Sequence, residues 1–324
     1  MVYIQADIIH CMEKHDMKYL SSQETKDVVD RVNTINFDDY SPENIDDMGV
    51  YKEHKNERKR LEAVIERADK PYLIYGAKGI GKTALIHSIC RDNGVALVEY
   101  NCGMGTSRAD LQGRTLVDDK GSYYEREFFP KCFEVANYFG HAVGYLDEVG
   151  ALEEDIQKWC NRPLDSRKSC SAGGRTYRLN EGCKLVFILT TNPVEYAGVN
   201  NLTEDLKSRL IGSIWDYPSA EEVEKIIDWT GIPVDYVKEP LLTFAQNTYS
   251  LRKKGEVEYV LSPRDLIQFV DVYRDNTEDF GKQGRTSDIL AETIKETILI
   301  KYTEDPQEQE LIKGRAAETF GVTL

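Results

Sequence analysis

The order of apolar and polar positions divides this chain into two parts. Between about residue 70 and residue 217, short apolar runs alternate with amphipathic segments, and these runs read PYLIYG, VALVEYN, AVGYLDE and KLVFILTTN. Buried strands that alternate with helices are typical of a parallel sheet covered on both faces. We therefore predict an α/β fold built on a parallel sheet for this part of the chain.

The strand pattern ends near Tyr217 and Pro218. Ser219 and Glu222 have the spacing of a capping box, which predicts the start of a helix. The remainder, to Leu324, shows mainly helical spacing of its apolar residues. We therefore predict an α/β domain over residues 51–217 and a smaller helical domain over residues 218–324.

The first 50 residues carry a weaker pattern. Ser21 and Glu24 fit another capping box, and valines at helical spacing follow it, so residues 1–50 are predicted to form a partly helical extension. The stretch DDYSPENIDD (38–47) is acidic and rich in turn formers, which predicts a loop with little to bury. Residues 57–68 follow as a charged helix with one apolar face.

A glycine-rich turn follows the first strand of the α/β part. The turn reads GAKGIGKT and fits the phosphate-binding pattern G-x-x-x-x-G-K-[ST], with a strand before it and a helix after it. Its glycines let backbone N–H groups point at phosphate oxygens, Lys82 supplies a charge to them, and the Thr83 hydroxyl can ligate Mg²⁺. The residues predicted to bind the nucleotide are Gly76, Ala77, Lys78, Gly79, Ile80, Gly81, Lys82, Thr83 and Ala84.

Polar residues close the later strands. Asp147 and Glu148 end the strand 142–146, and this pair suits a Mg²⁺ ligand followed by a general base for water. Asn192 ends KLVFILTTN, where its amide can hold the attacking water, although an Asn-Pro turn is the simpler reading. Asn101 ends VALVEYN, and we considered a hydrogen bond from it to Glu148 against an ordinary turn.

Composition narrows the class of partner and the compartment. The formal net charge is −15, from 41 basic and 56 acidic residues, which disfavours indiscriminate binding to phosphate backbones. The 7 cysteines include no C-x-x-C pair, so we expect reduced thiols in a cytoplasmic protein. The N-terminus lacks the pattern of a signal peptide, and no apolar run is long enough for a membrane span, so we expect no membrane association.

With these residues in place, the chain resembles AAA+ ATPases of the MoxR/CbbQ type over about residues 50–280. The phosphate loop, the Asp147-Glu148 pair and Asn192 match the family's Walker A, Walker B and sensor 1 in order. LTEDLKSRLIGSIWDYP is similar to the segment that carries the arginine finger, which would be Arg209. LSPRDLIQF is similar to the sensor 2 segment, which would place that role on Arg264.

The resemblance implies how these residues would work. Residues 51–217 would be the AAA+ nucleotide-binding domain and residues 218–324 its lid, with ATP and Mg²⁺ between them. Lys82, Glu148, Asn192, Arg209 and Arg264 would be catalytic, and Thr83 and Asp147 would hold the metal. Arg209 would act on the nucleotide of the next subunit of a ring, which we expect to be hexameric. The phosphate loop departs from the family in lacking its common Pro-Gly pair.

Two segments are candidates for contact with a client. Tyr123 and Tyr124 lie in the turn-rich segment DDKGSYYERE, and they would either line a central pore or pair across a hairpin. Residues 158–184 carry seven basic residues against Asp165 and Glu181. That excess would meet an acidic protein, a neighbour's nucleotide or nucleic acid, or would only be a solvated hairpin.

Three functions remain open at this point. The leading one is an ATP-driven remodelling or activating factor for a protein client, working with a von Willebrand-type partner as the resemblance implies. A nucleic-acid motor or loader of a restriction or viral system is the second, which the acidic charge disfavours. The third is a nucleotide-gated assembly switch.

Overall fold

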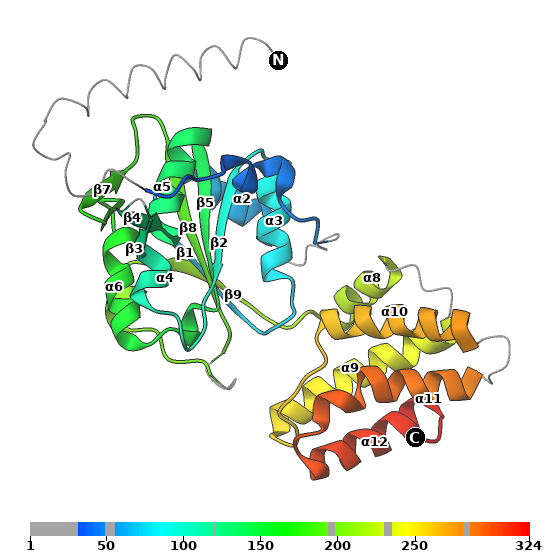
Figure 1. The fold of residues 1–324 in the computed structure, drawn as a ribbon. Helices are drawn as coiled ribbons and strands as arrows, with labels where there is room; N and C mark the ends of the chain where they lie inside the picture. The colour runs from blue at the N-terminus through cyan, green and yellow to red at the C-terminus, as the bar shows by residue number, and fades with distance from the viewer. Residues whose placement is uncertain (1–31, 49–55, 120, 194–197, 230–234, 281–285) are drawn as a thin grey trace, which may run out of the picture.

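A computed structural model describes residues 32–48, 56–119, 121–193, 198–229, 235–280 and 286–324 of the chain. The predicted helix near Ser21 lies outside these residues. Two bodies are visible side by side, one built around a sheet and one made of helices (Figure 1). Among the described residues, no helix combines the length and apolar character that crossing a membrane requires.

The sheet of the first body has five parallel strands in the order β2-β5-β8-β1-β9. Its strands are β1 (Tyr72–Gly76), β2 (Ala96–Asn101), β5 (His141–Asp147), β8 (Lys184–Thr191) and β9 (Ile211–Trp215). The helices around it are α2 (Glu57–Arg67), α3 (Lys82–Asp92), α4 (Arg108–Gln112), α5 (Phe128–Phe139), α6 (Glu154–Leu164) and α7 (Glu204–Lys207). The predicted α/β fold with a parallel sheet is confirmed.

Alternating side chains of the central strands enter two different cores. On β5, Val143 and Tyr145 pack with α2 and α3, whereas Ala142 and Leu146 pack with α5. On β8, Val186 and Phe187 separate in the same way. Both faces of these strands are therefore buried, which is why the strands read as continuous apolar runs in the sequence.

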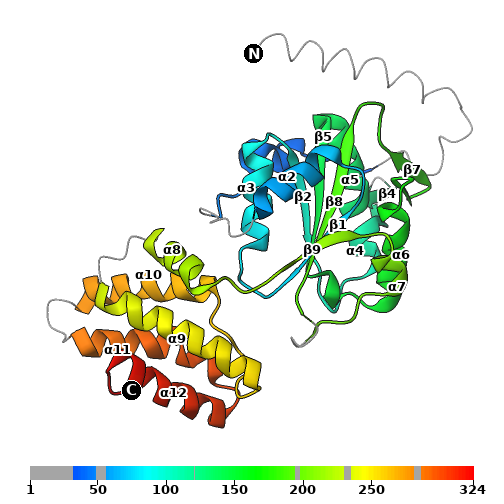
Figure 2. The ribbon, with the colours of Figure 1, turned by 180° about the vertical axis from the view of Figure 1, so that it is seen from behind.

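Two hairpins extend from one end of the sheet body. They are formed by β3 (Gly113–Asp118) with β4 (Gly121–Arg126), and by β6 (Ser169–Ala172) with β7 (Arg175–Arg178). Figures 1 and 2 show both hairpins beside α4 and α6. The ring of Tyr124 fills the space next to Gly173, where any Cβ atom would overlap it, so the first hairpin packs against the turn of the second.

The stretch from residue 37 to residue 45 has short helices where the sequence predicts a loop with little to bury. It contains the short 3₁₀ helices η2 (Phe37–Tyr40) and η3 (Pro42–Asn44). Phe37 stacks on Tyr138 of α5 with ring centroids 4.1 Å apart, and Tyr40 packs against the same core. The expectation of little to bury is confirmed, because no residue of η2 or η3 is buried. The partly buried side chains of Phe37, Tyr40 and Ile45 supply the apolar contacts of these short helices.

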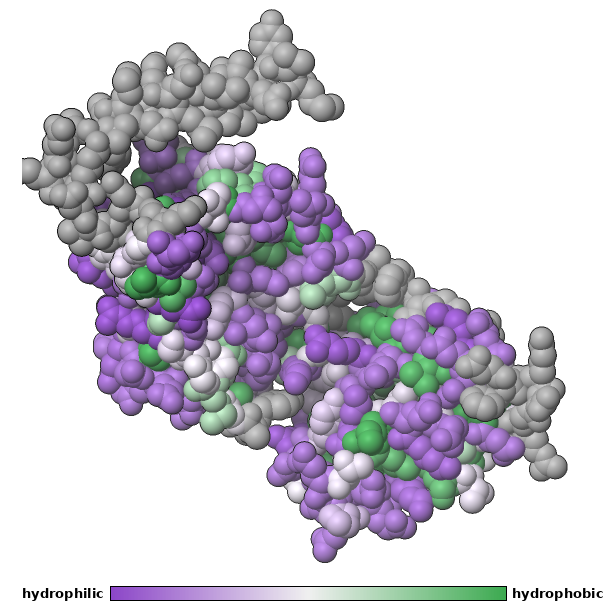
Figure 3. Space-filling model, in the orientation of Figure 1, coloured by the Kyte–Doolittle hydropathy of each residue, from purple (hydrophilic) through white to green (hydrophobic). Residues whose placement is uncertain are grey.

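The second body is helical and has its own apolar core. Its helices are α8 (Ala220–Trp229), α9 (Asp235–Lys254), α10 (Pro263–Phe280), α11 (Thr286–Thr297) and α12 (Pro306–Phe320), with the 3₁₀ helix η5 (Leu299–Tyr302). Ser219 and Glu222 make the reciprocal hydrogen bonds of the expected capping box before α8. Leu266 and Phe244 are fully buried at its centre, whereas its outer surface is mainly hydrophilic (Figure 3).

Candidate functional site

The glycine-rich turn bends sharply between β1 and α3. Gly79 has φ +77° and Gly81 has φ +90°, both in the left-handed region that disfavours residues with a Cβ atom. Gly81 is followed directly by α3, whose first residue is Lys82. The backbone of the turn therefore leads directly into the positive, N-terminal end of α3. This arrangement of turn and helix binds phosphate groups.

Lys82 is buried at the mouth of this turn. Its Nζ donates to the carbonyl oxygens of Gly76 at 2.7 Å and Ala77 at 2.8 Å, and to Asn192 Oδ1 at 3.0 Å. Only 8% of the side chain is exposed, and this burial lowers the pKa of Lys82 to about 8, partly opposed by the charges of Asp147 and Glu148. The ammonium group is therefore held in place inside the loop.

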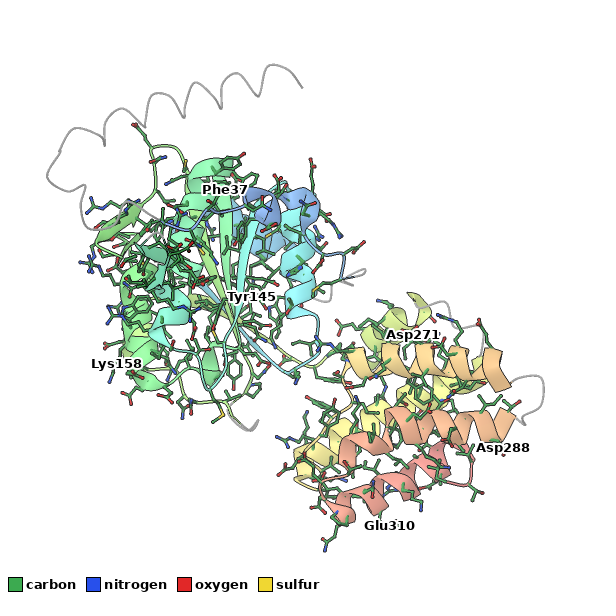
Figure 4. All side chains as sticks on the ribbon, viewed as in Figure 1. Phe37, Tyr145, Lys158, Asp271, Asp288 and Glu310 are labelled. Atoms are coloured by element: carbon green, nitrogen blue, oxygen red, sulfur yellow. The ribbon has the colours of Figure 1, made fainter. Side chains whose placement is uncertain are left out.

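Thr83 and Asp147 meet at the carboxyl end of the sheet. Thr83 Oγ1 donates to Asp147 Oδ2 at 3.4 Å and lies 3.0 Å from the hydroxyl of Tyr145. Asp147 Oδ1 in turn accepts a short hydrogen bond from Thr190. Tyr145 is labelled near the centre of the sheet body in Figure 4. The buried hydroxyls of Tyr145 and Thr190 therefore hold the side chains of Thr83 and Asp147 next to each other.

Glu148 stands at the edge of the same site. Its backbone is left-handed, with φ +55°, and its N–H donates to Thr190 Oγ1 at 3.2 Å. Asn192 Nδ2 donates to Glu148 Oε1 at 3.4 Å, so one amide side chain links Lys82 to Glu148. The considered hydrogen bond from Asn101 to Glu148 is wrong, because Asn192 makes that contact and Asn101 only lines the cleft.

A cleft of about 960 Å³ joins this end of the sheet to the helical body. The wall from the helical body includes Ile226 of α8 and Arg264 of α10. Gly79 approaches Ser262 so closely that a Cβ atom on Gly79 would overlap the Ser262 side chain. The positive charge of Arg264 adds to the lowering of the Lys82 pKa, which shows that the two cations face the same space.

The residues expected at the site do not all meet. The loop residues Lys78–Ala84 line the cleft together with Asp147, Glu148, Asn192 and Arg264. Arg209 lies elsewhere, half-buried in the turn after α7, where its guanidinium donates to the carbonyl of Asp205. Within one chain, therefore, Arg209 does not take part in the cleft.

The donor set fits a nucleotide with a magnesium ion. The cleft offers Lys82 and Arg264 as cations, the N-terminal end of α3, and the oxygens of Thr83 and Asp147, which are hard ligands of the kind Mg²⁺ prefers. A glycine at position 79 also leaves room where a side chain would close the loop against Ser262. The sequence did not single out Tyr145 and Thr190, because a buried hydroxyl on a strand has no distinctive spacing.

The lowered pKa of Lys82 predicts how nucleotide binding depends on pH. Below pH 8 the free protein carries the protonated amine, which attracts phosphate, and above pH 8 binding must first take up a proton. We expect the affinity for a fluorescent ATP analogue to be flat near pH 7 and to weaken by up to about tenfold per unit above pH 8. Lys82→Arg should flatten this profile, because a guanidinium stays charged. If the affinity of the wild-type protein for the analogue does not change between pH 7 and pH 9.5, the assignment of Lys82 as the phosphate-binding amine is contradicted.

Comparison with known proteins supports the class that this geometry indicates. Residues 71–210 match the model of the AAA domain (dynein-related subfamily). This segment contains β1, the glycine-rich turn, the Asp147-Glu148 pair and Asn192. Residues 71–210 therefore carry an AAA domain, and the chain is similar to proteins of the MoxR/CbbQ type, as the sequence resemblance implied.

Its relatives are distant in sequence. The denitrification regulatory protein NirQ of Pseudomonas aeruginosa is 25% identical over 63% of this chain and 77% of its own length. Protein CbbQ of Hydrogenophilus thermoluteolus is 22% identical over 48% of this chain and 57% of its own length. A solved structure of a RuvB variant from Thermotoga maritima covers 84% of each chain with a TM-score of 0.50 and 15% identity, which is a likeness of fold.

The structure decides between the two interpretations of Tyr123 and Tyr124. Tyr123 and Tyr124 lie on β4 opposite Leu116 and Thr115, and Tyr124 is buried with its hydroxyl donating to the carbonyl of Gln112. The cross-strand interpretation is therefore confirmed, and Tyr124 is not available to line a pore.

The basic residues of 158–184 do not form one patch. Lys158 pairs with Glu154, Arg167 with Asp165 and Lys184 with Glu66. Lys168 turns inward and donates to the carbonyls of Ala68 and Leu185. Much of the local excess of charge is therefore neutralised or satisfied within the chain, and Arg162, Arg175 and Arg178 are left exposed.

Proposed function

We propose that this protein is a Mg²⁺-dependent ATPase that uses hydrolysis to remodel or activate a protein client. The observation that carries the proposal is the meeting of Thr83 with Asp147, at 3.4 Å, beside the linked side chains of Lys82, Asn192 and Glu148. These groups come from the glycine-rich turn with the start of α3 and from the ends of two strands, β5 and β8, and they face one cleft. An AAA domain supports the same activity.

Each group has a separate task in this proposal. Thr83 and Asp147 would hold Mg²⁺, which supplies positive charge to the phosphate oxygens when it is bound. Lys82 would leave the carbonyls of Gly76 and Ala77 and donate to the phosphates. Glu148 would take the proton of the attacking water at a carboxylate oxygen, and Asn192 would hold Glu148 and that water in line.

The helical body would act as the lid of the cleft. Arg264 would contact the terminal phosphate from α10, so that loss of this phosphate changes the angle between lid and sheet body. The division into residues 1–50, 51–217 and 218–324 belongs to this proposal. It is supported by the separate apolar cores of the sheet and helical bodies.

Arg209 is the reason to propose a ring. It is half-buried and lies outside the cleft of its own chain, as expected of a residue that serves a neighbouring subunit. We propose a homo-oligomeric ring, in the six-membered form that the resemblance implies, in which Arg209 stabilises charge on the neighbour's phosphates.

The identity of the client follows from relatives only in outline. We propose a cytoplasmic protein client and a von Willebrand-type partner protein, supported by the similarity to NirQ, CbbQ and NorQ. The acidic net charge of −15 continues to disfavour nucleic acid as the main partner.

Arg209→Ala tests the ring. Because Arg209 makes no contact in its own cleft, we expect unchanged affinity for ATP and a loss of turnover of about 10³-fold. Steady-state hydrolysis and binding of a fluorescent nucleotide measure the two effects. Lys207→Ala, two residues away and also on the surface, is the matched control and should hydrolyse ATP normally.

Mixing separates a role in trans from a role in cis. A folded Lys82→Ala subunit has an intact Arg209, and an Arg209→Ala subunit has an intact cleft. Mixed rings should regain part of the lost activity at interfaces that combine the two intact halves. A mixture of two well-folded, assembled variants with no recovered activity would count against the arginine acting on a neighbour.

A further inference from the structure

Two arginines from different helices converge beside the hairpin β6–β7. The guanidinium carbon of Arg108, on α4, lies 5.3 Å from the ring centroid of Trp159 on α6. Arg162, one turn further along α6, donates from Nη2 to Ser171 Oγ at 3.2 Å. Arg108 is tied to the same residue, because Gln112 accepts from Arg108 and donates to the carbonyl of Ser171. Burial raises the pKa of the neighbouring Cys170 thiol, and the charges of both arginines oppose that rise.

The two guanidinium groups are held by neutral partners. Arg108 Nε donates to Gln112 Oε1 at 3.1 Å, and Gln112 Nε2 donates to the carbonyl of Ser171 at 2.7 Å. Trp159 is fixed from its other side by Phe129, with centroids 5.5 Å apart. Among the residues that the structure describes, no carboxylate bonds to either arginine, and Nη1 and Nη2 of Arg108 have no hydrogen-bond partner.

The acidic residues nearby are already engaged. Asp110 accepts from Ser107, Glu154 pairs with Lys158, and Asp165 pairs with Arg167. Arginines that are exposed, positioned by neutral groups and left without a counter-charge can receive a carboxylate through two parallel N–H donors. Stacking on Trp159 orients the plane of the Arg108 fork before any ligand arrives.

We propose that Arg108 and Arg162, with Trp159 between their helices, form a binding site for a carboxylate side chain of an acidic polypeptide segment. That the ligand is a polypeptide rests on the proposed function, in which the client is a protein. Two arginines suit one or two carboxylates, whereas a polynucleotide needs a longer track of cations.

The site lies where a client would meet the sheet body. It is built on α4, α6 and β6, beside the two hairpins and away from the nucleotide cleft, whose lining includes none of its residues (Figure 1). In Figure 4 the side chain of Lys158, the residue before Trp159, is labelled on the outer edge of the same helix. A ligand could therefore bind there while the cleft holds a nucleotide.

Peptide binding to the full-length protein tests the site. The probe is a fluorescein-labelled poly-glutamate peptide, followed by anisotropy at low and at physiological salt, with Trp159 fluorescence as a second readout. We expect Arg108→Gln with Arg162→Gln to weaken binding at least about tenfold, the ratio that corresponds to about 1.4 kcal/mol. The matched control is Arg274→Gln with Arg315→Gln, which removes the same charge from exposed positions of the helical body and should change binding by less than about twofold.

Several results would overturn the site. The first is that the wild-type protein binds no peptide at low salt, and the second is that the double variant binds the peptide as the wild type does. The third is that an oligo(dT) of equal charge binds as tightly as the peptide and that this binding is lost in the double variant. Arg108→Lys keeps the charge but lacks the two parallel N–H donors, so its affinity for the peptide is expected to lie between those of the wild type and the double variant. This single variant tests the site if the double variant fails to fold. ATP hydrolysis is assayed in parallel: activity without peptide binding removes this site alone, and peptide binding without activity removes the proposed function.

Discussion

Lys82→Ala is expected to abolish ATP binding. The ammonium group is buried in the turn and supplies hydrogen bonds to whatever lies at its centre. Two or more charge-assisted hydrogen bonds of about 1.5–3 kcal/mol each would be lost, which corresponds to at least about a hundredfold increase in the dissociation constant. Equilibrium titration with a fluorescent ATP analogue measures it.

The control for this variant is Lys70→Ala. Lys70 is an exposed lysine just before β1, so its removal changes the net charge equally and leaves the cleft intact. Thermal unfolding shows whether Lys82→Ala is folded, since its Nζ also satisfies two carbonyls of the loop. A folded Lys82→Ala protein with wild-type ATP affinity would refute the nucleotide site.

Glu148→Gln is expected to bind ATP and to hydrolyse it at least about a hundredfold more slowly, the range for removal of a general base. The amide has nearly the same shape and can still accept from Asn192, but it cannot take a proton from water. Release of phosphate under single-turnover conditions measures the loss. Glu153→Gln, an exposed glutamate five residues on, is the control and should hydrolyse ATP normally.

The same variant held in ATP should retain its client. Proteins that co-purify with Glu148→Gln in ATP and leave in ADP would identify the client and the partner protein. Hydrolysis at the wild-type rate by Glu148→Gln would show that another group activates the water.

Much of the α/β architecture could be predicted because it is written in local patterns. The strands around Val143 and Val186 are apolar along their whole length since both faces are covered, and the helix that begins at Lys82 follows a glycine turn with a fixed spacing. The position of Asp147 and Glu148 was also predictable, because carboxyl ends of parallel strands meet at one edge of the sheet.

The acidic composition of residues 38–47 predicted little burial there, and the structure agrees. No residue of η2 or η3 is buried, and Tyr40 and Ile45 pack against two cores while staying partly exposed. Asn101 and Asn192 both end strands, and sequence could not say which of them reaches Glu148. The order of the strands decides it, because β8 lies next to both β5 and β1 whereas β2 lies at the edge.

By itself, the sequence determined the phosphate loop, the strands that lead to it and the acids that follow the strand of Tyr145, since each depends on the spacing of neighbours along the chain. Only the tertiary structure decided that Thr190 holds Asp147, that Arg209 stays outside its own cleft, and that Arg108 lies over Trp159. These are contacts between residues far apart in the chain. Strand order and helix packing set them, and no local pattern records either.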